Sequence, residues 1–245
     1  MISEIICDKP RIEIVNGNYK DFLKTLPDKS IDLIYTDPPY EFINKNPQGG
    51  GFIINNRKQH FQNICKSFGM SFNPIEFLSL LPHIMKKFNC YIWTNKNLLK
   101  DYISFAEENG YKWDILLWIK PNPVPCQNGH YLHDKEYCIY MREPGAYFNS
   151  KLGYEKYRTF RSYPIGKKET THPTEKPLSI IRNPIEISSS TNDIVFDPFA
   201  GSFTVAVACA NLNRQFIGCE ISKEFYDMGK QRIDITLSQL SFLYL

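Results

Sequence analysis

One stretch decides the fold: IVFDPFAGSFT, residues 194–204. Its apolar start predicts a buried strand, and the residues from Thr204 to 212 predict a helix. Between them lies a turn in which Gly201 allows the backbone to approach a ligand closely. Open α/β sheets hold ligands at such turns, against the N-terminus of the following helix. The stretch therefore predicts an α/β domain with a ligand-binding turn.

Outward from this stretch, strand-like and helix-like segments alternate along the chain. The predicted strands are 12–15, 31–36, 90–94, 113–119, 137–141, 194–196 and 216–221, and the predicted helices are 19–26, 74–87, 98–109, 178–187, 204–212 and a last one from 223. This interleaving predicts an α/β fold with a doubly wound, mostly parallel sheet. We expect one domain over 1–245.

Two regions interrupt the alternation. Residues 41–73 show no repeating apolar face and contain three consecutive glycines. Loops of this length are usually functional, so we expect a mobile loop over an active site. Residues 120–171 contain five prolines and the basic run 151–168 around the strand 137–141. We expect this region to project from the core.

Composition limits the class of protein. Apolar residues make up 42% of the chain, which is enough for a substantial core. No apolar run approaches the roughly 18 to 20 residues that span a bilayer, and the N-terminus lacks an apolar signal core, so we expect a cytoplasmic protein without membrane contact. The net charge of +3 permits contact with a polyanion without requiring it. Seven scattered cysteines lack metal-binding or redox spacing, so we expect reduced thiols and no metal.

The glycine turn and Glu220 together indicate the class of cofactor. Glu220 ends the next predicted strand, from which a carboxylate can accept hydrogen bonds from both hydroxyls of a ribose. Taken singly, a glycine after a strand is more often a plain tight turn, and an acid at a strand end is more often a solvated cap. Their joint spacing favours an adenosine-containing cofactor. No Gly-Lys-Ser/Thr follows, which disfavours a phosphate-binding loop.

A second motif, Asp37-Pro38-Pro39-Tyr40, follows the predicted strand 31–36. A carboxylate and a backbone carbonyl that accept both N–H bonds of a ring-conjugated amino group would favour its attack on a methyl carbon, while Tyr40 stacks on the ring. The alternative is a plain surface turn, because Asp and Pro are common turn residues. A buried strand before the motif and a long loop after it favour a catalytic site made of Asp37, Pro38, Pro39 and Tyr40.

The two motifs together resemble those of the DNA amino-methyltransferases, and their order resembles the beta class of these enzymes. The resemblance spans nearly the whole chain. It implies a Rossmann-like fold of the S-adenosylmethionine-dependent methyltransferase type, with 120–171 as an inserted target-recognition region. Residues 118–123 resemble a segment near the family's target pocket, and 172–177 resemble an element beside the methionine end of the cofactor.

The resemblance also implies a set of cofactor-binding residues. They are Asn18, Asp37, His172, Thr174, Lys176, Asp197, Phe199, Gly201, Ser202, Thr204, Glu220 and Ile221. Asn18 stands where the family has an acid that contacts the cofactor adenine. The chain departs from the family pattern at Phe203, usually Gly, and at Val205, usually Thr. Phe203 would either narrow the cofactor pocket or cap it with an aromatic face.

The implied function is a restriction–modification type of DNA methylation. Double-stranded DNA would be the substrate, with the target nucleotide rotated out of the stack. Asp at the first motif position resembles adenine-N6 enzymes, and N4-cytosine methylation is the near alternative. More distant alternatives are an RNA or protein amide methyltransferase and a catalytically silent DNA-binding partner. Beta-class relatives often form dimers, so a homodimer is also implied. Candidate DNA contacts are Arg57, Lys58, Lys151, Lys156, Arg158, Arg161, Lys167 and Lys168, interleaved with Tyr154, Tyr157, Phe160 and Tyr163.

Overall fold

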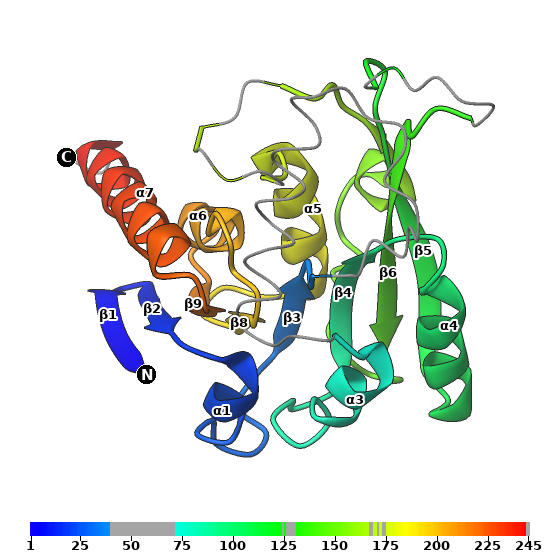
Figure 1. Ribbon diagram of the computed structural model, residues 1–245, viewed down its shortest axis with the longest axis horizontal. Coiled ribbons are helices and arrows are strands. Elements are labelled where there is room, and N and C mark those ends of the chain that lie inside the picture. The colour runs from blue at the N-terminus through cyan, green and yellow to red at the C-terminus, as the bar shows by residue number, and fades with distance from the viewer. Residues whose placement is uncertain are drawn as a thin grey trace.

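The described residues form one nine-stranded sheet that runs through the molecule (Figure 1). The computed structural model describes residues 1–39, 72–123, 125, 131–166, 169–170, 172 and 175–243. The strand order is β1-β2-β9-β8-β3-β4-β6-β5-β7. The strands are β1 Ile2–Asp8, β2 Arg11–Asn16, β3 Leu33–Thr36, β4 Asn89–Thr94, β5 Lys112–Ile119, β6 Lys135–Arg142, β7 Phe160–Ser162, β8 Ile194–Asp197 and β9 Gln215–Glu220.

Helices cover both faces of this sheet (Figure 1). On one face α1 Tyr19–Leu23, α3 Pro74–Ser79 and α4 Leu99–Glu108 bury one apolar cluster, and on the other α5 Leu178–Ser188, α6 Thr204–Asn211 and α7 Lys223–Leu243 bury a second. Five of the eight strand pairs are parallel. The prediction of a doubly wound, mostly parallel α/β sheet is confirmed.

The centre of the sheet contains a topological switch point. Strands β3 and β8 are parallel neighbours, with Leu33 opposite Val195. The chain continues from β3 to β4 on one side and from β8 to β9 on the other. Ligands of open α/β sheets bind beyond the carboxyl ends of such a strand pair, because the diverging connections leave a crevice there. Both sequence motifs begin at this edge.

Three expectations about the elements need correction. Residues 120–171 were expected to project from the core, but β6 lies inside the sheet between β4 and β5, with Cys138–Met141 buried. The helix expected over 74–87 ends at Ser79, because Pro82 lacks the N–H that a continuing helix needs. Strands β1 and β7 lie at the two edges of the sheet and were not predicted. The loop expected over 41–73 lies outside the described residues apart from Phe72 and Asn73.

Other sequence expectations concern membranes and thiols. None of the described helices is both long and apolar enough to cross a membrane. Cys90, Cys138, Cys209 and Cys219 are buried free thiols, and Cys7 is a half-buried one. The remaining two cysteines, 65 and 126, fall outside the described part of the chain.

Phe203 starts α6 and points into the core. Its φ of 55° lies in the left-handed region, where a residue other than glycine is strained by about 1 kcal/mol. The side chain is fully buried, and its ring makes edge contacts with Phe216 and Tyr226. Burial of such a ring contributes about 2–3 kcal/mol, which offsets the strain. The ring therefore has no exposed face that could cap a cofactor, and it packs in the core between Phe216 of β9 and Tyr226 of α7.

Gly229 of α7 has no side chain, and the Phe203 ring occupies the space that a side chain there would fill. A Cβ at position 229 would lie 1.9 Å from Cδ2 of Phe203. In an exposed helix, glycine to alanine would stabilise by up to about 1 kcal/mol. Here we expect Gly229→Ala to destabilise the protein by about 1–3 kcal/mol, because overpacking forces the ring or the helix to move. Urea unfolding of the purified variants measures this change.

Gly153→Ala is the matched control, because a Cβ there meets nothing within 4 Å. In a Phe203→Leu background, the same Gly229→Ala change should be less destabilising than in the wild type. Equal stabilities of Gly229→Ala and the wild type would contradict this packing account.

Candidate active site

The two sequence motifs meet where β3 and β8 end. Thr36, the last residue of β3, donates its hydroxyl to Oδ1 of Asp197 at 2.7 Å, and the backbone N–H of Phe199 donates to the same oxygen at 3.1 Å. Burial raises the pKa of the Asp197 carboxyl to about 7; these two hydrogen bonds oppose that rise, and the nearby Asp37 and Glu220 carboxyls add to it. The proline motif and the glycine turn are thus joined by a buried hydrogen bond.

Asp37 directly follows β3 and offers one free acceptor. Its Oδ2 accepts a hydrogen bond from the ammonium of Lys176. Its Oδ1 is buried and has no hydrogen-bond partner among the described residues. Burial raises the pKa of the Asp37 carboxyl, and Lys176 opposes that rise. A buried acceptor without a partner is costly, so its presence indicates that a donor from outside the protein completes it.

Lys176 joins Asp37 to the strand β6. Its ammonium lies 3.5 Å from Oε2 of Glu136 and 4.9 Å from the centre of the Trp93 ring. Glu136 also accepts a hydrogen bond from Lys120. Burial favours the neutral form of Glu136, but Lys176 and Lys120 hold its pKa below the ordinary value. Four charged side chains, Asp37, Lys176, Glu136 and Lys120, therefore form one continuous chain of ion pairs.

The glycine turn and Glu220 form the second half of the site. Oε2 of Glu220 accepts the backbone N–H of Gly201 at 2.9 Å, and Oε1 accepts that of Ser222 at 2.8 Å. Burial raises the pKa of this carboxyl to about 7, although these backbone bonds oppose the rise. Each oxygen keeps a second lone pair, so the carboxyl can still accept hydroxyl groups.

His172 lies against the glycine turn. Gly201 has a φ of 50°, and a Cβ there would come within 3.0 Å of Nε2 of His172. Glycine is therefore required both by the backbone angle and by the imidazole. The imidazole also makes an edge contact with Phe225 of α7, at 4.4 Å between ring centres.

The end of β2 borders the same turn. Asn18 caps α1, because its side-chain oxygen accepts the backbone N–H of Lys20 at 2.9 Å. The neighbouring Gly17 donates its N–H to the carbonyl of Glu220, and the Ile221 carbonyl accepts from the side chain of Asn16. Phe199 packs on Tyr19 at 4.6 Å between ring centres. Asn18, Phe199, Glu220 and Ile221 thus lie around one edge of the turn.

The structure brings most of the predicted site residues together. Asp37 pairs with Lys176, and Thr36, which precedes Asp37, bonds Asp197. Gly201 lies against both Glu220 and His172. The hydroxyls of Ser202 and Thr204 hydrogen-bond each other at 2.9 Å in the same turn. Pro38 is buried and Pro39 half-buried beside Asp37. Tyr40 and Thr174 lie outside the described residues. Among the described residues, no group of three or more His, Cys, Asp or Glu side chains is arranged to hold a metal.

The sequence analysis missed Glu136 and Thr36 as members of the site, and it included Lys120 only within the segment 118–123 that resembles a target-pocket segment. Glu136 carries no local signal, because it is one of several polar residues in a strand. It reaches Lys176 only because β6 pairs with β4 in an antiparallel register, with Trp93 opposite Cys138. Thr36 could have been noticed as the last residue of a buried strand directly before the motif.

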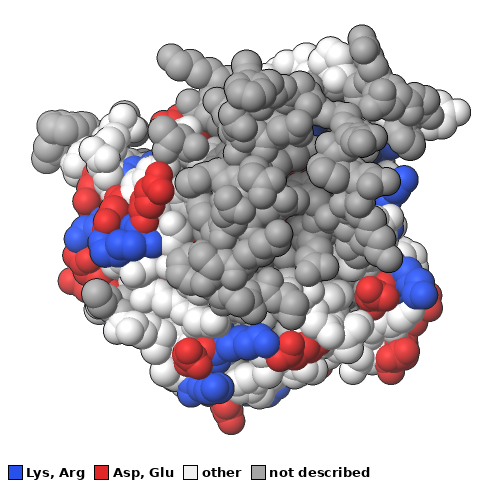
Figure 2. Space-filling view, viewed as in Figure 1, with Lys and Arg blue, Asp and Glu red and all other residues white. Residues whose placement is uncertain are grey.

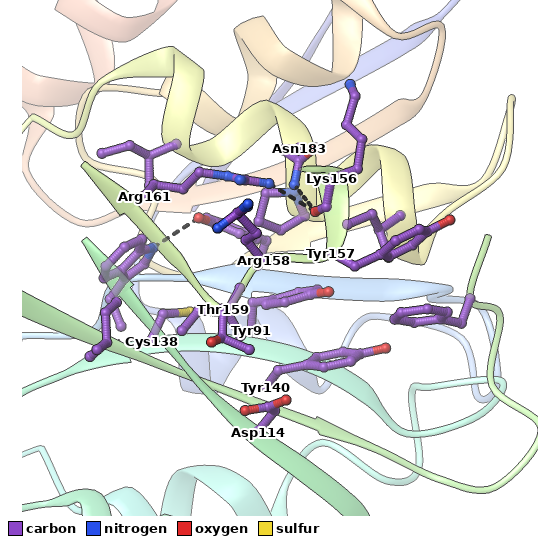
Figure 3. Close-up of a pocket in the computed structure, with 18 residues that line it drawn as sticks. Tyr91, Asp114, Cys138, Tyr140, Lys156, Tyr157, Arg158, Thr159, Arg161 and Asn183 are labelled. Carbon is purple, nitrogen blue, oxygen red and sulfur yellow. Dashed lines mark hydrogen bonds between the residues drawn. The ribbon is translucent and has the colours of Figure 1, made fainter. Parts of the chain in front are cut away.

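A separate cavity of about 90 Å³ lies between α5 and the sheet (Figure 3). Tyr91 and Tyr140 stack on its sheet side, with ring centres 4.1 Å apart, and Lys156, Arg158 and Arg161 lie opposite. These cations already have partners within the protein: Glu186, Glu155 and the carbonyls of residues 155 and 156, respectively. Neither sequence motif contributes to the lining of this cavity.

Known proteins are similar to this chain over the residues that form both halves of the site. A family model for N6 and N4 methyltransferases, described as DNA methylase, matches residues 31–231. The chain is 32% identical over 243 residues to the type II methyltransferase M2.MboI of Moraxella bovis, covering 92% of this chain and 88% of that protein. It is 27% identical over 252 residues to the DNA adenine methyltransferase YhdJ of Escherichia coli strain K12, covering 91% and 82%.

Solved structures agree with these matches. The crystal structure of the M1.HpyAVI–SAM complex superimposes with a TM-score of 0.67 at 28% sequence identity, covering 91% of this chain and 99% of that chain. The residues matched by the family model, 31–231, include both motifs.

Proposed function

Because this chain belongs to the DNA methylase family, we propose that it methylates N6 of adenine in duplex DNA, with Asp37 as the acceptor for the target amine. The chain is an S-adenosylmethionine-dependent DNA methyltransferase. The observation that carries the finer proposal is the buried, unpartnered Oδ1 of Asp37 beside the glycine turn. Support for adenine comes from the adenine-specific relative YhdJ and from Asp at the first motif position.

The residues around the glycine turn fit the cofactor. Asp37, Asp197 and Glu220 are three carboxyls at one edge of the sheet, and burial raises the pKa of each. A cationic sulfonium compound suits this set, because a positive charge stabilises the ionised acids. We propose that Glu220 accepts the ribose hydroxyls, that Asn18, Phe199 and Ile221 border the adenine, and that His172, Thr174, Lys176, Ser202 and Thr204 surround the methionine end. When bound, the cofactor supplies the methyl group.

Asp37 activates and orients the target nitrogen. The lone pair of an exocyclic base nitrogen is delocalised into the ring, so the nitrogen is a weak nucleophile. Oδ1 of Asp37 accepts one of its N–H bonds and favours the pyramidal form with an available lone pair. Lys176 holds Oδ2, which fixes the direction of Oδ1. As the nitrogen gains the methyl group, the cofactor would be released as a neutral thioether, and the proton that the nitrogen loses would pass along its hydrogen bond to Oδ1 of Asp37.

We propose that residues 120–171 recognise DNA through aromatic side chains. Tyr131 and Tyr154 are 99% and 93% exposed, and Phe160 and Tyr163 are exposed as well. Exposed rings of this kind stack on unpaired bases. Figure 2 shows described Lys and Arg residues beside Asp and Glu residues around the rim of the visible face, so the described charges of this face are of both signs. Arg57, Lys58, Lys167 and Lys168 lie outside the described residues.

The oligomeric state and the location complete the proposal. The family resemblance supports a homodimer, which analytical ultracentrifugation tests directly. DNA and S-adenosylmethionine are both available in the cytoplasm, which is where we place the reaction.

Identification of the methylated base tests the proposed specificity. The purified protein is incubated with duplex DNA and S-adenosylmethionine, and the DNA is digested to nucleosides for mass spectrometry. We expect N6-methyladenine. N4-methylcytosine instead would overturn the adenine assignment and retain the family chemistry.

The role of Asp37 predicts the effect of removing its carboxylate. Asp37→Ala should lower the rate of methyl transfer by about a hundredfold or more, because one preorganised acceptor is lost. Calorimetry should show a much smaller loss of cofactor affinity, because Asp197 and Glu220 remain to favour the positive charge. Asp28→Ala, at an exposed position, is the control and should remain fully active. Activity of Asp37→Ala above about a tenth of the wild type would remove Asp37 from this role.

Removing the charge of Lys176 should change the pH dependence of methyl transfer. Asp37 accepts an N–H bond best when ionised, burial raises its pKa, and Lys176 lowers it. Burial and the Glu136 charge raise the pKa of Asp37, and in Lys176→Met only Lys120 still lowers it. The pKa of Asp37 should therefore rise further. The acidic limb of the kcat/KM profile should therefore move to higher pH, measured between about pH 5 and 9 with saturating cofactor.

Lys176→Arg keeps the positive charge and should leave the acidic limb near its wild-type position. An acidic limb that stays in place in Lys176→Met would show that Asp37 does not control it.

A further inference from the structure

Arg232 of α7 occupies the centre of a largely buried network beside the glycine turn. One guanidinium nitrogen, Nη1, donates to the Ser202 carbonyl at 2.9 Å and to the Thr204 hydroxyl at 2.7 Å. The other, Nη2, donates to Oε2 of Glu169 at 2.6 Å and lies 3.1 Å from Oε1 of Glu175. Arg232 is only 9% exposed. A single side chain therefore joins the glycine turn to the segment 169–176.

Glu175 is the buried partner of Arg232 in that segment, whereas the Glu169 side chain is 66% exposed. Its side chain is 6% exposed, and its Oε2 also accepts the N–H of Thr170 at 2.9 Å and the Thr170 hydroxyl at 2.5 Å. The described residues of 169–176 form neither helix nor strand, so no ladder of backbone bonds holds them. Side-chain bonds to Glu175 and Arg232 replace that ladder.

The segment held in this way carries two residues of the site. Lys176, next to Glu175, is the ion-pair partner of Asp37, and His172 lies against Gly201. Arg232 itself is not close to either motif in sequence. Its Nε is buried and has no hydrogen-bond partner among the described residues, which is an unfavourable arrangement that the four other contacts must offset.

We propose that Arg232 is a positioning residue for the cofactor: through Ser202, Thr204 and Glu175 it fixes the glycine turn and the 169–176 segment in their binding geometry before the cofactor arrives. A preorganised site loses less conformational freedom on binding, so it binds more tightly than a mobile one with the same contacts. The proposal rests on the placement of the cofactor at this turn.

The size of the effect follows from the kind of bond. A hydrogen bond to a charged group contributes about 1.5–3 kcal/mol, and about 1.4 kcal/mol corresponds to a tenfold change in affinity. If that bond maintains the geometry needed for binding, its loss should weaken binding about tenfold to a hundredfold. Arg232→Lys retains the charge but loses the planar fork that reaches both sides at once. Glu175→Gln retains the shape but loses the charge.

Isothermal calorimetry of the full chain with S-adenosylmethionine tests the proposal, alongside thermal unfolding without ligand. We expect Arg232→Lys and Glu175→Gln each to raise the Kd about tenfold or more. The double variant should be less impaired than the product of the two single effects, because both act through one contact. The KM for the cofactor should rise more than kcat falls. Lys230→Met is the control, because it removes an ion pair of α7 with Glu4 on the surface.

Hydrogen exchange of the cofactor-free protein gives a readout independent of folding yield and of activity. The N–H groups of Gly201 and Phe203 donate to Glu220 and to the Ala200 carbonyl, and we expect their protection to fall in Arg232→Lys but not in Lys230→Met. A Kd and protection within twofold of the wild type, with only a lowered unfolding temperature, would overturn the proposal and leave Arg232 a plain stabilising residue.

Glu220→Ala separates this inference from the placement of the cofactor. If Glu220→Ala weakens binding while Arg232→Lys does not, the placement stands and the positioning role of Arg232 is wrong. If neither variant weakens binding, the placement at the glycine turn is itself wrong.

Discussion

The parallel pairing of β3 with β8 is the constraint on which the site depends. These strands belong to distant parts of the chain, and their carboxyl ends leave the sheet side by side at its switch point. The buried bond from Thr36 to Asp197 ties the two ends together. Asp37 and Gly201 therefore share one crevice because of the strand order rather than because of any direct contact between them.

Placing these strand ends together also concentrates acidic side chains. Asp37, Asp197 and Glu220 lie in a region where burial disfavours ionisation, and the Asp37 and Glu220 carboxyls add to the rise in the pKa of Asp197. The protein itself compensates at one point, where Lys176 and Glu136 connect Asp37 to β6. The remaining unfavourable electrostatics suit a positively charged ligand. The clustered carboxyls thus lower the stability of the protein without the cofactor and favour binding of the positively charged sulfonium.

Two large side chains solve packing problems around the glycine turn. Phe203 adopts a left-handed backbone angle where the family usually has glycine, and the missing side chain of Gly229 gives its ring a place in the core. Arg232 donates hydrogen bonds to the buried Ser202 carbonyl and Thr204 hydroxyl of the turn. Gly229 and Arg232 both belong to α7, so the last helix supports the shape of a turn to which it contributes no residue.

The sequence alone determined the alternation of strands and helices, the two motifs and their order, because apolar periodicity, proline and glycine act within a few residues. It also correctly placed Asp37 directly after a strand, Gly201 in the turn between a strand and a helix, and Glu220 at the end of a strand. Only the tertiary structure decided that β6 enters the sheet beside β4, that Glu136 reaches Lys176, that Phe203 points into the core and that Arg232 joins two loops. These contacts connect residues far apart in the chain, and their geometry depends on strand register and side-chain direction, which no local pattern encodes.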